Sequence, residues 1–248
     1  MTAPGPLALL GGGEHREPCR PVDRWLLERT GVARPRVVVV PAASLPGTRP
    51  ATIALARTWW ASLGARATAV APEDVTAAVD AVAAADVVVL TGGVPAALVR
   101  RLGASPVWDA IVERWRAGAA LSGSSAGAMA MMAWRLRLVP PSPFGLTPGL
   151  GPLEGYVVVP HFDRLVARSS VMRRVAVRRQ RSYDGLAVLG IDEGTGVVSH
   201  GGEHLVLGAG AATTIDADGW HQHPSGSATP ALLGPPALAG PLTPVRAA

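Results

Sequence analysis

The sequence predicts an α/β protein built on a mostly parallel sheet with helices on both faces. Short, fully apolar runs recur along the first half of the chain, and amphipathic stretches of helical length separate them. Strands buried on both faces require such uninterrupted runs, and strand–helix–strand alternation produces parallel pairing through right-handed crossovers. The 248 residues suit one large domain of this kind.

The first half of the chain contains the elements of the predicted sheet. Strands are expected at Pro6–Leu10, Val37–Val40, Ala65–Val70, Val87–Leu90 and Ala119–Leu121. Helices are expected between them at Pro21–Arg29, Ala51–Leu63, Glu73–Ala84 and Pro106–Ala117. Proline or acidic residues in the first turn, typical of helix starts, support the first, third and fourth of these helices.

The pattern changes after Leu136. A strand at Gly155–Val159 leads into a helix expected over Asp163–Arg179. Short strands with glycine turns follow, which favours a small antiparallel C-terminal extension; they are expected at Leu186–Ile191, Gly196–Ser199, His204–Leu207 and Ala212–Ile215. The predicted domain covers residues 1–223, because the Pro, Ala and Gly content of residues 224–248 is typical of a poorly ordered tail.

The composition excludes several classes of function. A single cysteine, Cys19, excludes an internal disulfide and a cysteine-based zinc site. The net charge is +5, and all the basic Lys/Arg residues are arginine. The absence of lysine is a sign of codon bias, so the charge does not indicate nucleic-acid binding. The positive charge does favour acidic ligands. No apolar stretch approaches the roughly 20 residues of a membrane span, and no leader is evident, so a cytoplasmic protein without membrane contact is expected.

The strongest functional signal is Gly123-Ser124-Ser125-Ala126-Gly127. It matches the G-x-S-x-G pattern and stands between a predicted strand and a predicted helix, the context in which a strained turn lifts the central serine out of the sheet. The register makes Ser125 the candidate nucleophile. The alternative is a Gly/Ser loop that only caps a helix.

Other glycines also follow predicted strands. Gly13 and the pair Gly92-Gly93 fall at the carboxyl edge of the sheet, as Ser125 does, and ligands bind at that edge in open α/β sheets. The N–H groups of Gly93 and Ala126 are therefore the candidate oxyanion hole. The alternative is that these glycines serve tight turns only.

A catalytic serine needs a base and a carboxylate that orients the base. His161 follows a buried strand and is the first candidate base; His15 is the second, or a substrate contact. His221 and His223 lie among late turns, and no metal site is expected there. Asp192 and Glu193 follow another apolar strand, and since adjacent side chains point in opposite directions, only one of them can face His161.

Five blocks in one order resemble the serine peptidase family of aspartyl dipeptidase (dipeptidase E) and cyanophycinase. They are the triple glycine after the first strand, Thr91-Gly92-Gly93, the Ser125 block, Pro160-His161-Phe162 and Gly190-Ile191-Asp192-Glu193-Gly194-Thr195. The resemblance spans about residues 7–200. It implies a flavodoxin-like three-layer sandwich related to class I glutamine amidotransferases. It also implies a Ser125–His161–Glu193 triad, with Asp192 as the fallback, and no cofactor.

The resemblance implies hydrolysis of peptide bonds next to aspartate, hence a small, acidic peptide as substrate. Val94-Pro95 departs from the family pattern, which has polar residues there, and this bears on the substrate more than on the chemistry. Two other functions compete. An amidotransferase-like domain would need cysteine at the elbow, and a non-catalytic binding module would not need Ser125, His161 and Glu193 together.

An arginine cluster follows His161. Arg174, Arg178 and Arg181 share one face of the predicted helix. The cluster is interpreted as a solvated face, a site for a substrate carboxylate or, least favoured, a nucleic-acid contact. Gly13, His15, Arg173 and Arg174 are the expected substrate contacts, and a homodimer is a further possibility.

Overall fold

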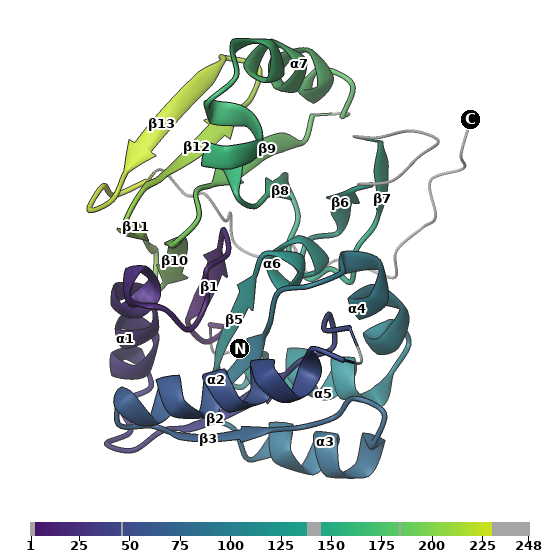
Figure 1. Cartoon of the computed structure of the whole chain (residues 1–248), viewed down its shortest axis with the longest axis vertical. Helices are drawn as coiled ribbons and strands as arrows, with labels where there is room; N and C mark the ends of the chain where they lie inside the picture. The colour runs from purple at the N-terminus through teal and green to yellow at the C-terminus, as the bar shows by residue number, and fades with distance from the viewer. Residues whose placement is uncertain (1–2, 46, 138–144, 184, 230–248) are drawn as a thin grey trace.

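The computed structural model describes residues 3–45, 47–137, 145–183 and 185–229. Within this part of the chain, a seven-stranded sheet forms the centre, in the order β11-β10-β1-β5-β4-β2-β3 (Figure 1). Its strands are β1 (Leu7–Leu10), β2 (Arg36–Val40), β3 (Arg66–Ala69), β4 (Val87–Leu90), β5 (Ala120–Ser124), β10 (Thr195–His200) and β11 (Glu203–Gly208). The first five are parallel, and β10 and β11 add an antiparallel edge beside β1. The predicted fold class is confirmed.

Helices cover both faces of this sheet. One face packs on α1 (Arg20–Arg29) and α2 (Arg49–Ser62), whose tryptophans are buried against the valines of β2 and β4. The other face packs on α3 (Val75–Ala83), α4 (Pro95–Leu102), α5 (Pro106–Arg116) and the short α6 (Ala126–Ala130). The alternating valines of the strands therefore supply two cores, one on each side of the sheet.

A second sheet lies at the carboxyl ends of the central strands, above them in Figure 1. Its order is β13-β12-β9-β8, formed by β8 (Tyr156–Val159), β9 (Ala187–Ile191), β12 (Ala211–Ile215) and β13 (Trp220–Pro224). The β8–β9 pair is parallel and the other two pairs are antiparallel. A π-helical turn, η2 (Asp163–Ala167), and α7 (Ser170–Gln180) cover it through a third apolar core.

The prediction of one continuous helix over Asp163–Arg179 is wrong. The structure breaks it at Ser169, whose hydroxyl oxygen accepts the Met172 N–H at 3.2 Å and caps α7. Serine favours this position because it satisfies an N–H group that has no partner inside the helix. The Ser169-Ser170 pair is the feature of the sequence that marks this helix start.

Several elements were not predicted from the sequence: α4, the 3₁₀ turn η1 (Glu17–Cys19), the pair β6 (Trp134–Leu136) and β7 (Leu146–Pro148), and β13. Helix α4 begins directly at Pro95, with Val94 as its N-cap. Proline is common at the first helical position, where its missing N–H has no intrahelical acceptor anyway. Val94-Pro95, which departs from the family pattern at positions that bear on the substrate, is therefore a helix start.

Strand β13 also changes the placement of two histidines and of the predicted tail. His221 and His223 lie on this strand, and not in turns as predicted. Beyond it, Gly226 N–H donates to Val206 O at 2.8 Å and Thr229 N–H donates to His204 O at 2.9 Å. Backbone contacts with β11 thus extend past the predicted boundary at residue 223 as far as Thr229. The rest of the predicted tail, residues 230–248, lies outside the described residues. No helix in the described ranges has the length and apolar character to cross a membrane.

Asp23 is a buried carboxyl group on the inner face of α1. Its Oδ2 accepts the indole N–H of Trp59 at 2.7 Å, and burial raises its pKa to about 7. Because the folded state holds this proton more tightly than the unfolded state does, the resulting stabilisation is fully present below about pH 4. It is lost as the pH rises through about 7.

We expect Asp23→Asn to flatten this pH dependence, because asparagine keeps an acceptor for Trp59 and cannot ionise. The wild type should lose up to about 1.4 kcal/mol of unfolding free energy per pH unit between pH 4 and 7 relative to the variant. Urea titrations across this range measure it, with Asp80→Asn on the exposed face of α3 as the matched control. Parallel curves for wild type and Asp23→Asn would contradict the assignment.

Candidate active site

Ser125 stands at a sharp turn between β5 and α6. It is the N-cap of α6 and has φ 48° and ψ −107°, a backbone conformation that non-glycine residues rarely adopt. Its N–H donates to Leu10 O at 2.9 Å, which ties the turn to the end of β1. A Cβ atom at Gly127 would lie 2.5 Å from Leu90 O, so only glycine allows α6 to start this close to β4. The strained strand-to-helix turn predicted around Ser125 is therefore present in the structure.

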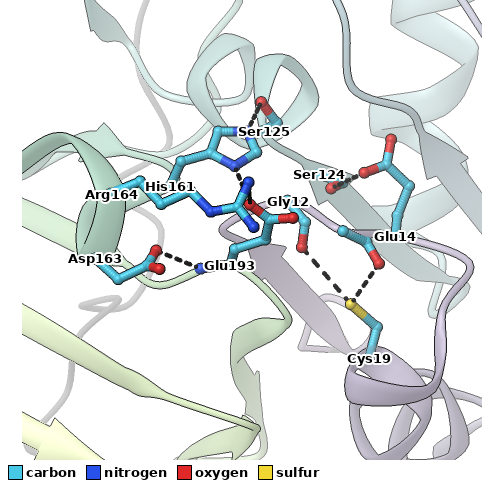
Figure 2. Close-up of polar contacts among 10 residues, drawn as sticks. Gly12, Glu14, Cys19, Ser124, Ser125, His161, Asp163, Arg164 and Glu193 are labelled. Carbon is cyan, nitrogen blue, oxygen red and sulfur yellow. Dashed lines mark hydrogen bonds and ion pairs between the residues drawn. The ribbon is translucent and has the colours of Figure 1, made fainter.

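Ser125, His161 and Glu193 form one hydrogen-bonded chain (Figure 2). Ser125 Oγ lies 3.1 Å from His161 Nε2, and His161 Nδ1 lies 3.3 Å from Glu193 Oε2. Ser125 comes from the central sheet, whereas His161 follows β8 and Glu193 follows β9 in the second sheet. The order of contacts is the one that a serine nucleophile, a base and an orienting carboxylate require.

The loop after β1 holds His161 in place. His161 also has a positive φ, 49°, and its N–H donates to Gly11 O at 2.8 Å. Its imidazole lies directly against Gly12, where an added Cβ would be 2.1 Å from Cε1. Two constraints therefore require glycine at residue 12: the position of the His161 ring and the φ of 119°.

Glu193, and not Asp192, contacts His161. The Glu193 N–H donates to Asp163 Oδ1 at 3.0 Å, and Arg164 binds Glu193 Oε2 at 2.6 Å. The Arg164 side chain is 61% exposed, so solvent screens this ion pair. Asp192 faces the other way: its Oδ2 accepts the Ala211 N–H at 2.9 Å, and burial raises its pKa.

The candidate oxyanion donors are the N–H groups of Gly93 and Ala126. Gly92 precedes Gly93 in the turn after β4, and a Cβ on Gly92 would lie 3.3 Å from Ser125 Cβ. Ala126 N–H is the first amide of α6. Within the described residues, the N–H groups of Gly93 and Ala126 have no hydrogen-bond acceptor, so both are free to bind a developing negative charge.

Glu14 is a site residue that the sequence analysis missed. Its Oε1 accepts the Gly92 N–H and its Oε2 accepts the Ser124 hydroxyl, both at 2.7 Å. A signal was available, because Glu14 follows the glycine run at the end of β1, the same position that singled out Gly13 and His15.

The expected substrate contacts occupy different places. Gly13 lies beside Glu193, since a Cβ on it would be 3.2 Å from Glu193 Cγ. His15 is buried, edge-on to Trp60 with a ring separation of 6.3 Å, and burial lowers its pKa. Arg173 and Arg174 line an open groove on α7 with Val177, Arg178, Arg181 and Trp220. Among the described contacts, none joins either arginine to Ser125, His161 or Glu193.

Cys19 lies near the site, and its thiol is hydrogen-bonded to the loop after β1. Its Sγ donates to Gly13 O at 3.2 Å, and burial raises its pKa to about 12 (Figure 2). A thiol with this pKa is not ionised at neutral pH and is a poor nucleophile. Over the described ranges, no group of three or more His, Cys, Asp or Glu side chains is placed to hold a metal ion.

A parallel sheet with a serine at a strand-to-helix elbow, facing a histidine and a glutamate, defines an α/β protein of the nucleophile-elbow class. The model of peptidase family S51 matches residues 7–207, and the chain belongs to this family. The family of dipeptidase E and cyanophycinase predicted from the sequence is thereby confirmed.

Solved structures share the fold. The crystal structure of a peptidase from an acI-B1 Actinobacterium matches with a TM-score of 0.80 and 24% identity, over 92% of this chain and 97% of that one. The structure of a putative peptidase E protein from Listeria monocytogenes EGD-e matches with a TM-score of 0.63 and 15% identity, over 84% and 100% of the two chains. No curated protein matches this chain.

Gly12→Ala should displace the His161 ring, and Gly118→Ala should not. Both glycines have similar positive φ values, 119° and 107°, so both variants should lose about 1 kcal/mol of folding stability or more. Only at Gly12 does the new methyl meet the imidazole, because the space around Gly118 is open. Imidazole NMR shifts of His161, assigned with a His161→Ala sample, measure the displacement, and unchanged shifts in Gly12→Ala would contradict it.

Proposed function

We propose that the protein is a serine-type peptidase that hydrolyses small peptides next to an aspartyl residue. The observation that carries the serine mechanism is the Ser125–His161–Glu193 chain of contacts at a strained elbow. Backbone strain of this kind costs about 1–3 kcal/mol and persists where the surrounding structure enforces it, commonly at active sites. A binding module would gain nothing from this strain.

The reaction proceeds in two acyl-transfer steps. Ser125 Oγ attacks the scissile carbonyl while His161 Nε2 takes its proton, and the N–H groups of Gly93 and Ala126 bind the oxyanion. The imidazolium then returns the proton to the leaving amine as the C–N bond breaks. Water, deprotonated by His161, attacks the acyl ester and frees Ser125.

Glu193 has a separate task in this scheme. It accepts the Nδ1–H of His161, which leaves Nε2 free to take the serine proton, and it stabilises the imidazolium. Arg164 and the Asp163 carboxylate hold Glu193 from two sides, at its carboxylate and at its backbone N–H. The carboxylate is therefore oriented before substrate arrives.

The aspartyl preference rests on the family, together with the net charge of +5. A positively charged protein raises the local concentration of acidic peptides. Of the competing functions, amidotransfer would need a cysteine nucleophile, and the one cysteine of the chain is a buried thiol with a pKa of about 12. A cytoplasmic location and a homodimer stay predictions.

Ser125→Ala should abolish covalent labelling by a fluorophosphonate probe and hydrolysis of Asp-X dipeptides. Removing a triad serine typically leaves only the residual rate from binding and the oxyanion hole, a loss of about 10⁶-fold. Intact mass and a dipeptide screen measure the two effects, with Ser182→Ala, an exposed serine, as the matched control. Dipeptide hydrolysis that survives in Ser125→Ala would refute the assignment. If the wild type neither labels nor hydrolyses Asp-X or β-Asp-X peptides, the peptidase proposal fails.

Glu193→Gln should lower kcat by roughly 10³- to 10⁴-fold, because a glutamine amide can donate to Nδ1 and stabilise the wrong tautomer. Asp192→Asn should keep kcat within a few-fold, since Asp192 faces Ala211 and not His161. Steady-state kinetics on the same dipeptide compare the pair. Equal losses of kcat in both variants would show that the rate depends on the loop as a whole and not on the Glu193 carboxylate.

A further inference from the structure

The Arg101 side chain joins helix α4 to the loop that follows β2. Its Nη1 donates to Ala42 O at 2.5 Å and to Ser44 O at 2.9 Å. Ala42 and Ser44 are buried, and Arg101 itself is largely covered, with a side-chain exposure of 19%. A guanidinium nitrogen carries its N–H groups in a fixed plane, so a single atom can hold both carbonyl groups at once. Arg101 therefore fixes the two ends of a short segment, residues 42–44.

The residue between these two carbonyl groups, Ala43, contacts the turn that follows β4. Ala43 O accepts the Val94 N–H at 2.9 Å. Gly93 lies against the same carbonyl group, since a Cβ atom added to Gly93 would be 2.3 Å from Ala43 O and 3.1 Å from Ala43 Cβ. Gly93 also has a φ of 139°, which only glycine adopts readily. The position of Ala43 therefore determines where the Gly93 end of this turn lies.

The Gly93 N–H is one of the two candidate oxyanion donors, and its direction depends on two anchors. This N–H belongs to the peptide group that joins Gly92 to Gly93. Glu14 holds the Gly92 end by accepting the Gly92 N–H at 2.7 Å, and Ala43 holds the Gly93 end. An oxyanion donor has to lie about 2.7–3.1 Å from the developing charge, so even a small shift of either anchor weakens the contact.

The guanidinium of Arg101 makes its short contacts with backbone carbonyl groups. Within the described residues, its ion-pair partner is Glu73, whose Oε1 lies 3.6 Å from Arg101 Nε and 2.8 Å from Arg49 Nη2. Glu73 is 53% exposed, so solvent screens both pairs. Hydrogen bonds from a charged donor are stronger than those from a neutral one, and this makes the Arg101 contacts suited to hold a loop in place.

We propose that Arg101 is a positioning residue for the oxyanion hole, which acts through Ala43 to align the Gly93 N–H. The inference rests on the proposed function and deepens it. Helix α4 starts two residues after Gly93 and brings Arg101 back to the loop that carries Ala43, so the turn, the helix and the loop form a closed ring of contacts. The other candidate donor, the Ala126 N–H, belongs to α6 and does not take part in this ring.

A role of Arg101 in stability alone predicts a different result. Loss of its two hydrogen bonds would then lower the free energy of unfolding and leave the turnover of each folded molecule unchanged. Misalignment of an oxyanion donor acts on the transition state, so kcat and kcat/KM fall together while KM stays the same. The split between kcat and KM, measured on folded protein, therefore distinguishes the two roles.

The kinetic test compares Arg101→Met, Arg101→Lys and the wild type on Asp-Leu, with Arg100→Met, an exposed neighbour on α4, as the matched control. Arg101→Met should lower kcat about 10- to 100-fold with KM unchanged, less than the loss of a whole donor, which costs about 100- to 1000-fold. Arg101→Lys should restore most of kcat, because an ammonium can donate to both carbonyl oxygens. Wild-type kcat in folded Arg101→Met, or a loss confined to KM, would overturn the proposal.

Amide NMR shifts of the substrate-free protein test the inference without catalysis. Arg101→Met should move the Gly93 amide signal and leave that of Ala126 in place, and Arg100→Met should move neither. If Arg101→Met does not fold, Arg101→Lys decides, because a point donor in place of the planar guanidinium should still shift the Gly93 signal. A moved Gly93 signal supports the inference even if the wild type hydrolyses no peptide, in which case only the proposed function fails. An unmoved signal overturns the inference in an active enzyme as well.

Discussion

The glycine loop at the end of β1 is the constraint on which the site depends. Gly11 O accepts the His161 N–H, and Gly12 O accepts the Gly194 N–H beside Glu193 at 2.9 Å. The Gly12 Cα forms the surface on which the imidazole lies. His161 and Glu193, which follow strands of the second sheet, are thus fixed to the central sheet through two consecutive residues without side chains, Gly11 and Gly12. Any side chain there would occupy the space of the contacts that join the two sheets.

The parts of the fold that follow from local pattern could be predicted from the sequence. Runs such as Val37–Val40 are apolar on both faces and have one structural solution, a strand inside a covered sheet. The turn at Ser125 could also be predicted, because the G-x-S-x-G pattern is recognised from the strand before it and the helix after it. The elements that were missed lack such patterns: β13 is a polar strand, Trp220–Pro224, that is defined by pairing with β12.

Some residues of the candidate site could likewise be predicted from local pattern, and others could not. Ser125 and His161 could be chosen because each ends an apolar run. The choice between Asp192 and Glu193 needed the position of Ala211, which pairs with Asp192 from a strand far along the chain. Glu14 could be ranked only once the turn at Gly92 was known to lie over it, since nothing near residue 14 reveals a partner 78 residues away. Contacts between distant segments carry this information, and one sequence does not show them.

The proposed triad draws its members from two sheets, and this has a consequence for how the protein matures. By the time the chain has been synthesised through α6, the serine and both candidate oxyanion donors are present. His161 comes some 35 residues later, directly after β8, which pairs with β9. Glu193 lies between β9 and β10, and β10 pairs with β1. In the proposed mechanism, a growing polypeptide therefore lacks the base for Ser125 until most of the domain has been made, so a nascent chain would not hydrolyse neighbouring peptides.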